Sequence, residues 1–157
     1  MKISRRRGGV QLRVEPIERA VLVQLFSDAL SSIGPDGGDA DDAVRQRLYP
    51  DAYRDDAVAA AEYRGLTETT LAAERIQRVR DCISELEVPG EPLELDAEAG
   101  QRWLRALNDV RLVLGTRLEV TEDGRDAIDP ASPDAPQWLA YDWLTGVQDG
   151  LVRALMR

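Results

Sequence analysis

The 157-residue chain carries 29 acidic and 20 basic side chains, which give a formal net charge of −9 and a pI near 4.6. A field of this sign repels polyanions, so any contact with DNA would need a local basic patch. No apolar run is long enough to cross a bilayer, and one cysteine cannot form an internal disulfide. We therefore expect a cytoplasmic protein that makes no membrane contact.

Histidine is absent from the sequence. The chain therefore lacks the commonest general base and zinc ligand, and it cannot build a Ser-His or Cys-His nucleophile pair. The aspartates between 36 and 42 do not have the spacing of a calcium-binding loop. We predict no metal, no cofactor and no catalytic residues, and hence a protein that is not an enzyme.

Length and composition fit a single domain over residues 1–157, because 43% hydrophobic residues suffice for one core. Residues 1–14 predict a β-hairpin, since apolar and polar residues alternate from Val10 to Val14 and Gly8-Gly9 suits a tight turn with positive φ angles. Residues 15–157 predict a helical body. The fold class is thus mainly α, a bundle of about five or six helices with a short N-terminal hairpin.

Helical periodicity and end signals place the helices along the chain. The segment 17–33, preceded by Pro16, carries two apolar stripes and should form the most buried helix. Thr67 is expected to cap a separate helix that follows a shorter one at 55–63, and Asp96 to cap a long helix that ends near Thr121. The remaining helices are expected at 41–48 and, after a capping box formed by Asp134 and Gln137, in the C-terminal segment.

Four segments carry a family resemblance: YPDAYRDD at 49–56, WLRALNDVRL at 103–112, LGTRL at 114–118 and YDWL at 141–144. Together with the Arg/Gly hairpin they resemble an actinobacterial family of short helical proteins long described as a domain of unknown function. Genes of this family commonly lie beside that of the Clp protease adaptor, and members are called AosR-type oxidative-stress transcriptional regulators.

The resemblance implies regulation of redox or cysteine metabolism linked to DNA, with a sigma factor or RNA polymerase as protein partner. It implies no catalytic residue. One departure matters, because an intramolecular disulfide switch needs two thiols and this sequence has only Cys82. If members of the family sense oxidants in that way, this chain cannot.

Arg5, Arg6 and Arg7 beside the predicted turn are the best local candidates for a nucleic-acid or partner contact. A basic β-ribbon can enter a DNA groove or lie along phosphates. The alternative is that these arginines remain solvated and offset an acidic body. A helix-turn-helix across Ala61, Gly65 and Leu71 is a weaker candidate, because Glu68 and Glu74 would face phosphates with the wrong sign.

Cys82 is expected on the apolar side of its helix, where a cysteine mostly behaves as a small inert hydrophobe. A redox role would require exposure and nearby positive charge. Tyr49, Tyr53 and Arg54 lie in a loop-like segment and are a candidate partner surface, although they could equally pin this loop to the core.

The three tryptophans are expected mostly in the core, and Gly146 and Gly150 permit close approach to a helix of this chain or of a second copy in a homodimer. Two functions remain open. The first is a transcriptional regulator that acts through DNA or RNA polymerase, which the resemblance implies. The second is a protein-interaction module linked to Clp-dependent proteolysis or stress, which the low pI and the lack of a convincing recognition helix favour.

Overall fold

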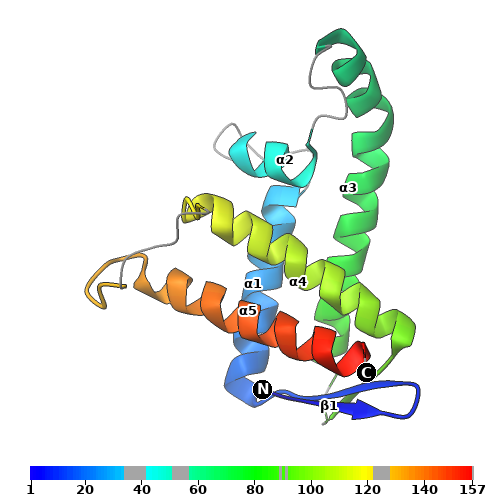
Figure 1. The fold of residues 1–157 in the computed structure, drawn as a ribbon, viewed down its shortest axis with the longest axis vertical. Helices are drawn as coiled ribbons and strands as arrows, with labels where there is room; N and C mark the ends of the chain where they lie inside the picture. The colour runs from blue at the N-terminus through cyan, green and yellow to red at the C-terminus, as the bar shows by residue number, and fades with distance from the viewer. Residues whose placement is uncertain (34–41, 51–56, 89, 91, 122–127, 157) are drawn as a thin grey trace.

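A computed structural model describes residues 1–33, 42–50, 57–88, 90, 92–121 and 128–156, and for 57–67 only the course of the helix. These residues form five α-helices and a three-stranded antiparallel sheet (Figure 1). The expected class, mainly α with an N-terminal hairpin, is confirmed. None of the described helices is both long and apolar enough to span a bilayer.

The sheet consists of β1 (Lys2–Arg6), β2 (Gly9–Arg13) and β3 (Leu93–Asp96), in that order, with β2 in the middle. Arg6 pairs with Gly9, so Arg7 and Gly8 form the turn, and Gly8 takes the positive φ of 86°. Gly9 is required for a different reason than we predicted. A Cβ atom there would lie 2.0 Å from the Leu95 carbonyl oxygen, so glycine lets β3 approach β2.

The strand β3 was not predicted from the sequence. Its residues pair with β2 from Gly9↔Asp96 to Leu12↔Leu93, directly before Asp96 caps the next helix. The Asp96 side chain accepts a hydrogen bond of 2.8 Å from the Ala99 backbone N–H, which confirms the predicted cap. A short strand and a helix cap thus share one residue.

Two helices form the layer nearest the viewer in Figure 1. They are α4 (Ala97–Arg117) and α5 (Ala135–Leu155), which run antiparallel. Gly100, near the start of α4, meets Leu155 at the end of α5, and the pairing continues along their length. α4 ends earlier than the predicted Thr121. The predicted capping box of α5 is wrong, because the Asp134 side chain makes no cap hydrogen bond.

The helix α1 (Pro16–Ile33) crosses behind α4 and α5 (Figure 1). Leu22, Phe26 and Ile33 are fully buried, and the Phe26 ring packs edge-on against Trp103 with centroids 5.8 Å apart. The prediction that α1 is buried on two sides is wrong. Its second apolar stripe begins with Ile17 and Val21, which are 73% and 37% exposed, so the described residues leave the start of this stripe uncovered.

The remaining helices are α2 (Asp42–Leu48) and the 31-residue α3 (Ala57–Glu87). α3 is continuous, so the predicted cap at Thr67 and the separate helix before it are wrong. Its first part projects beyond the other helices, and its last part packs on α1 (Figure 1). Arg19 of α1 donates hydrogen bonds to the carbonyls of Leu86, Val88 and Gly90, which fixes the end of α3.

Candidate functional site

The hairpin arginines lie together at one end of the molecule, as the sequence predicts. Arg5 and Arg6 end β1, Arg7 opens the turn, and all three side chains are exposed. Arg6 donates a 2.7 Å hydrogen bond to the Gln11 side chain, whose amide in turn donates to Glu94. This ladder crosses all three strands on the face of the sheet opposite to that of Val10 and Leu12, and it fixes Arg6 on that face.

Arg5 lies on the opposite face of β1, which turns toward α5. Together with Ile3 it borders a groove of about 610 Å³ between β1 and α5. The wall on the α5 side includes Trp143, Val147 and Arg153. The groove therefore has apolar walls and an arginine from each of the two elements, and we call it the β1–α5 groove.

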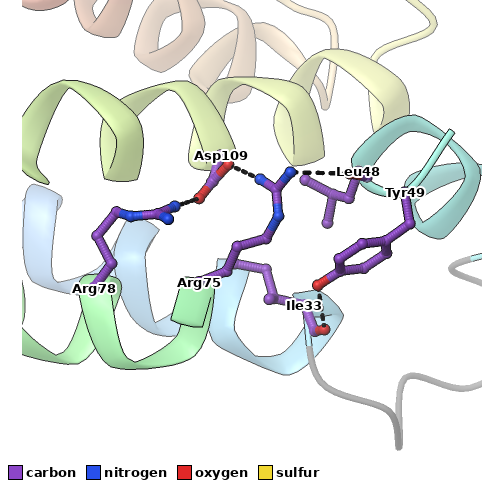
Figure 2. A network of polar contacts seen from close by, with 6 residues as sticks. All are labelled: Ile33, Leu48, Tyr49, Arg75, Arg78 and Asp109. Atoms are coloured by element: carbon purple, nitrogen blue, oxygen red, sulfur yellow. Dashed lines mark hydrogen bonds and ion pairs between the residues drawn. The ribbon is translucent and has the colours of Figure 1, made fainter. Parts of the chain in front are cut away.

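A second polar cluster joins α2, α3 and α4 (Figure 2). The Asp109 carboxylate, only 2% exposed, accepts hydrogen bonds from Arg75 and, at 2.8 Å, from Arg78. Arg75 also donates to the Leu48 carbonyl at 2.9 Å. Burial raises the pKa of Asp109, and the two guanidinium groups oppose that shift. Both oxygens of the carboxylate are therefore occupied by the two arginines, and these charge-assisted hydrogen bonds stabilise the packing of α3 on α4.

Tyr49 belongs to the same cluster and not to an exposed surface. Its side chain is 8% exposed, its hydroxyl donates to the Ile33 carbonyl at 3.3 Å, and its ring lies 5.3 Å from the Arg75 guanidinium carbon. Tyr49 therefore pins the end of α2 to the core, which was the second alternative for this segment. Tyr53 and Arg54 lie outside the described residues.

Another polar interaction, which is partly buried, joins α3 to α4. Glu85 accepts a 2.6 Å hydrogen bond from the Trp103 indole N–H and forms an ion pair with Arg102. Trp103 is fully buried, whereas Trp138 and Trp143 are only partly buried. The expectation that tryptophans pack in the core holds fully for Trp103, and the carboxylate satisfies its one polar atom.

Comparison with known proteins shows the family of this chain. Residues 1–155 match the family described as Domain of unknown function (DUF2017). The chain belongs to this family. The DUF2017 chain is similar to the protein named Oxidative stress regulator AosR of Mycobacterium tuberculosis, with 31% identity over 128 residues, 73% of this chain and 59% of the relative.

The same identity and coverage are found for the Oxidative stress regulator AosR of Mycobacterium bovis. The Putative oxidative stress regulator AosR of Mycobacterium leprae is 30% identical over 129 residues, which are 74% of this chain. The chain spans about three fifths of the length of these relatives. No solved structure matches it significantly.

The cysteine of this DUF2017 chain is buried. Cys82 is 0% exposed, and burial raises its pKa to about 12, with a further contribution from the nearby Glu85 carboxylate. Thiolate formation is the prerequisite for reaction with oxidants, so this environment disfavours the redox role. The inert alternative fits the geometry.

The helix-turn-helix candidate does not agree with the structure. A turn at Gly65 is required between its two helices, and α3 passes through that position without interruption. In the described part of the chain, no group of three or more Cys, Asp or Glu residues could hold a metal ion. The aspartates between 36 and 41 lie outside the described residues.

Proposed function

We propose that this chain is a non-enzymatic regulator of the oxidative-stress response that acts on transcription through contacts with DNA or with RNA polymerase and its sigma factor. The observation that carries the proposal is its similarity, at 31% identity over 73% of the chain, to proteins named oxidative stress regulators. The placement of the basic side chains supports a role in contact with other macromolecules. Arg75 and Arg78 are engaged by Asp109, whereas Arg5, Arg6 and Arg7 are presented to solvent.

The hairpin is the part of the chain best suited to a DNA contact. A net charge of −9 opposes approach of a polyanion to most of the surface, so phosphate contacts would depend on these three arginines. Each phosphate that is neutralised releases about one counterion, which makes such binding steeply dependent on salt. The hydrogen bond from Arg6 to Gln11 orders one of the three side chains before any partner arrives.

A second candidate is a protein-interaction module linked to Clp-dependent proteolysis that does not bind DNA. The continuous α3 favours it, since this helix leaves no recognition helix at the position that the sequence suggested. The acidic overall charge favours it as well, because contacts with a protein partner do not require a basic surface.

In either case we propose that the oxidant signal reaches the chain through a partner and not through Cys82. A buried thiol whose pKa is raised to about 12 is almost wholly protonated at physiological pH. Regulation by a reactive thiol would need an exposed thiolate. The partner is therefore expected to carry the redox-sensitive group.

The proposal is tested by fluorescence anisotropy with duplex DNA from host promoters of oxidative-stress genes and, in parallel, with RNA polymerase that carries each sigma factor. The triple variant Arg5→Ala, Arg6→Ala and Arg7→Ala should lose at least about tenfold in affinity for the relevant partner. A matched triple variant in which the exposed Arg47, Arg80 and Arg105 become alanine removes the same charge elsewhere.

Three outcomes are decisive. DNA binding that weakens with salt and depends on the hairpin supports direct contact with a promoter. Polymerase binding without DNA binding supports the sigma-factor route. If the chain binds neither and leaves in vitro transcription from these promoters unchanged, the transcriptional proposal is wrong and the interaction module takes its place.

A further inference from the structure

Among the described residues, one edge of the strand β1 has no neighbouring strand. The order of the sheet is β1-β2-β3, so in the part of the chain that the structure describes β1 pairs with β2 and with no strand on its other side. Free edges present unpaired N–H and C=O groups to which an extended peptide can add. We propose that an extended, acidic segment of a protein partner adds to β1 and places its alternate side chains in the β1–α5 groove.

The β1–α5 groove lies on the side of β1 where such side chains would point. Ile3 and Arg5 border it, whereas Arg6 is hydrogen-bonded on the other face of the sheet. Its volume of about 610 Å³ is enough for several side chains. Gly146 leaves the α5 wall of the groove open, since no described atom outside its own stretch of helix lies within 4 Å of the place that a Cβ atom would take.

Gly150, one turn further along α5, shows the contrast. A Cβ atom there would lie 3.1 Å from the Cδ1 atom of Ile3, so a side chain at this position would require Ile3 to shift, and the glycine lets α5 lie close to β1. Gly146 has no such role within the described residues. The open space above it lies beside Trp143 and Val147 and suits an apolar side chain of the occupant.

The charge of the site selects an acidic occupant. Arg5 and Arg153 line the groove, and Lys2, Arg6 and Arg7 are exposed at or beside the same strand. A second copy of the chain is a poor occupant, because pairing two β1 strands would place these cations against each other. The apolar walls favour a protein segment over nucleic acid, because apolar side chains of a peptide gain from burial in the groove and a phosphate backbone does not.

The inference rests on the proposed function in giving the same hairpin a macromolecular partner, but its main test uses a peptide in place of promoter DNA or polymerase. The probe is a fluorescein-labelled peptide that alternates Glu and Val, titrated into the full chain and followed by polarisation. Hydrogen exchange of the β1 amides is measured in the same samples. We expect saturable binding that weakens with salt, together with protection of amides between Lys2 and Arg6.

A peptide that alternates Lys and Val serves as the charge control. Equal binding of the two peptides would show that charge does not select the occupant, and absence of binding by the acidic peptide would overturn the proposal. If a DNA duplex protects the β1 amides and the acidic peptide does not, the occupant is nucleic acid and the proposal is also wrong.

Two substitutions at Gly146 separate occupancy of the groove from damage to the fold. Gly146→Leu extends a side chain into the groove and should weaken peptide binding at least about tenfold. Gly146→Ala leaves most of the groove open and should bind as the parent chain does. Parent-like binding by Gly146→Leu would refute the assignment.

Two charge-reversal variants, one in the groove and one away from it, keep the test decisive even if Gly146→Leu does not fold. Arg153→Glu reverses a charge in the groove and should weaken binding by roughly the same factor. Arg80→Glu reverses an exposed charge on α3 and should leave binding unchanged. Equal effects of the two reversals would show that only the net charge of the chain matters, and the site would be rejected.

Discussion

Replacing Asp109 by asparagine tests what the buried carboxylate does for the helix packing. The substitution keeps the shape of the side chain and removes the charge that Arg75 and Arg78 share. Burial raises the pKa of Asp109, so the charged form of this carboxylate is less favoured in the fold than in the unfolded chain. The cost of Asp109→Asn should therefore come mainly from the two guanidinium groups that lose their acceptor.

The expected loss in the free energy of unfolding follows from those two guanidinium groups. Hydrogen bonds to charged partners are worth about 1.5–3 kcal/mol each, and breaking one side of a fully buried pair costs about 3–5 kcal/mol. The arginine side chains are 22% and 18% exposed, so water compensates part of the loss. We expect Asp109→Asn to lower the free energy of unfolding by about 2–4 kcal/mol, and the midpoint of thermal unfolding by roughly 5–15 °C.

The assay is urea unfolding followed by the fluorescence of the buried Trp103, with Asp149→Asn on the exposed face of α5 as control. A double-mutant cycle adds Arg78→Met, which retains an apolar stem. The two changes should couple by about 1–3 kcal/mol, because the methionine variant no longer buries a charge that needs Asp109. A loss below about 0.5 kcal/mol for Asp109→Asn, or strict additivity in the cycle, would refute the reasoning.

Three further predictions concern single positions. The Cys82 thiol should resist iodoacetamide until the protein unfolds, and labelling of the native protein as fast as of the urea-unfolded chain would contradict this. Because its pKa is raised from 9.0 to about 12, the contribution of the thiol to the free energy of unfolding is complete below pH 9 and is lost as the pH rises toward 12. Gly9→Ala should destabilise the fold by at least about 2 kcal/mol, because its Cβ atom would clash with β3. Gly146→Ala should stabilise the fold by about 0.5–1 kcal/mol, because this helical position is open. Equal midpoints of urea unfolding for the two variants would contradict these different surroundings of the two glycines. Asp96→Ala should lower the free energy of unfolding by about 1 kcal/mol and Asp134→Ala by much less, since only the Asp96 side chain caps its helix. Circular dichroism during thermal unfolding measures both variants. Similar losses of stability would be evidence against this difference between the two caps.

The sequence predicts the elements that depend only on residues close to one another in the chain. The alternation from Val10 to Val14 gave the hairpin, and Asp96 gave the start of α4. The four-residue β3 was missed because two apolar residues, Leu93 and Leu95, are too few to distinguish a strand from a loop. Its pairing with β2 depends on a long-range contact that no local pattern carries.

The errors in the helices have the same origin. Thr67 resembles a cap, but α3 continues through it. In α1 the stripes that contain Ile17 and Leu22 have the same spacing, so periodicity alone cannot tell which one faces the core. The contact of Asp109 with Arg75 and Arg78 joins positions more than thirty residues apart, and it was not predicted.

The candidate site was predicted in part. The exposed position of Arg5, Arg6 and Arg7 follows from a turn beside a strand, which is local information. The β1–α5 groove could not be predicted, because Arg153 and Gly146 reach the hairpin only through the packing of α5 on β1. The sequence suggests the same role for Gly146 and Gly150, close approach to another helix, whereas the structure gives the two glycines different surroundings.

The distribution of charge connects the two proposals. A chain with a net charge of −9 that carries several exposed cations on one hairpin has an uneven field, so an acidic partner is repelled from most of the surface and attracted to β1. Such a field acts mainly on the rate of association and on orientation, and it weakens as salt shortens the Debye length. The apolar walls of the β1–α5 groove act only after contact, when Trp143 and Val147 can exclude water from an occupant. Reversal of Arg153 should therefore slow association and make the association rate less dependent on salt. If the partner also buries this arginine, the same reversal should speed dissociation. Filling the space above Gly146 should act on dissociation alone.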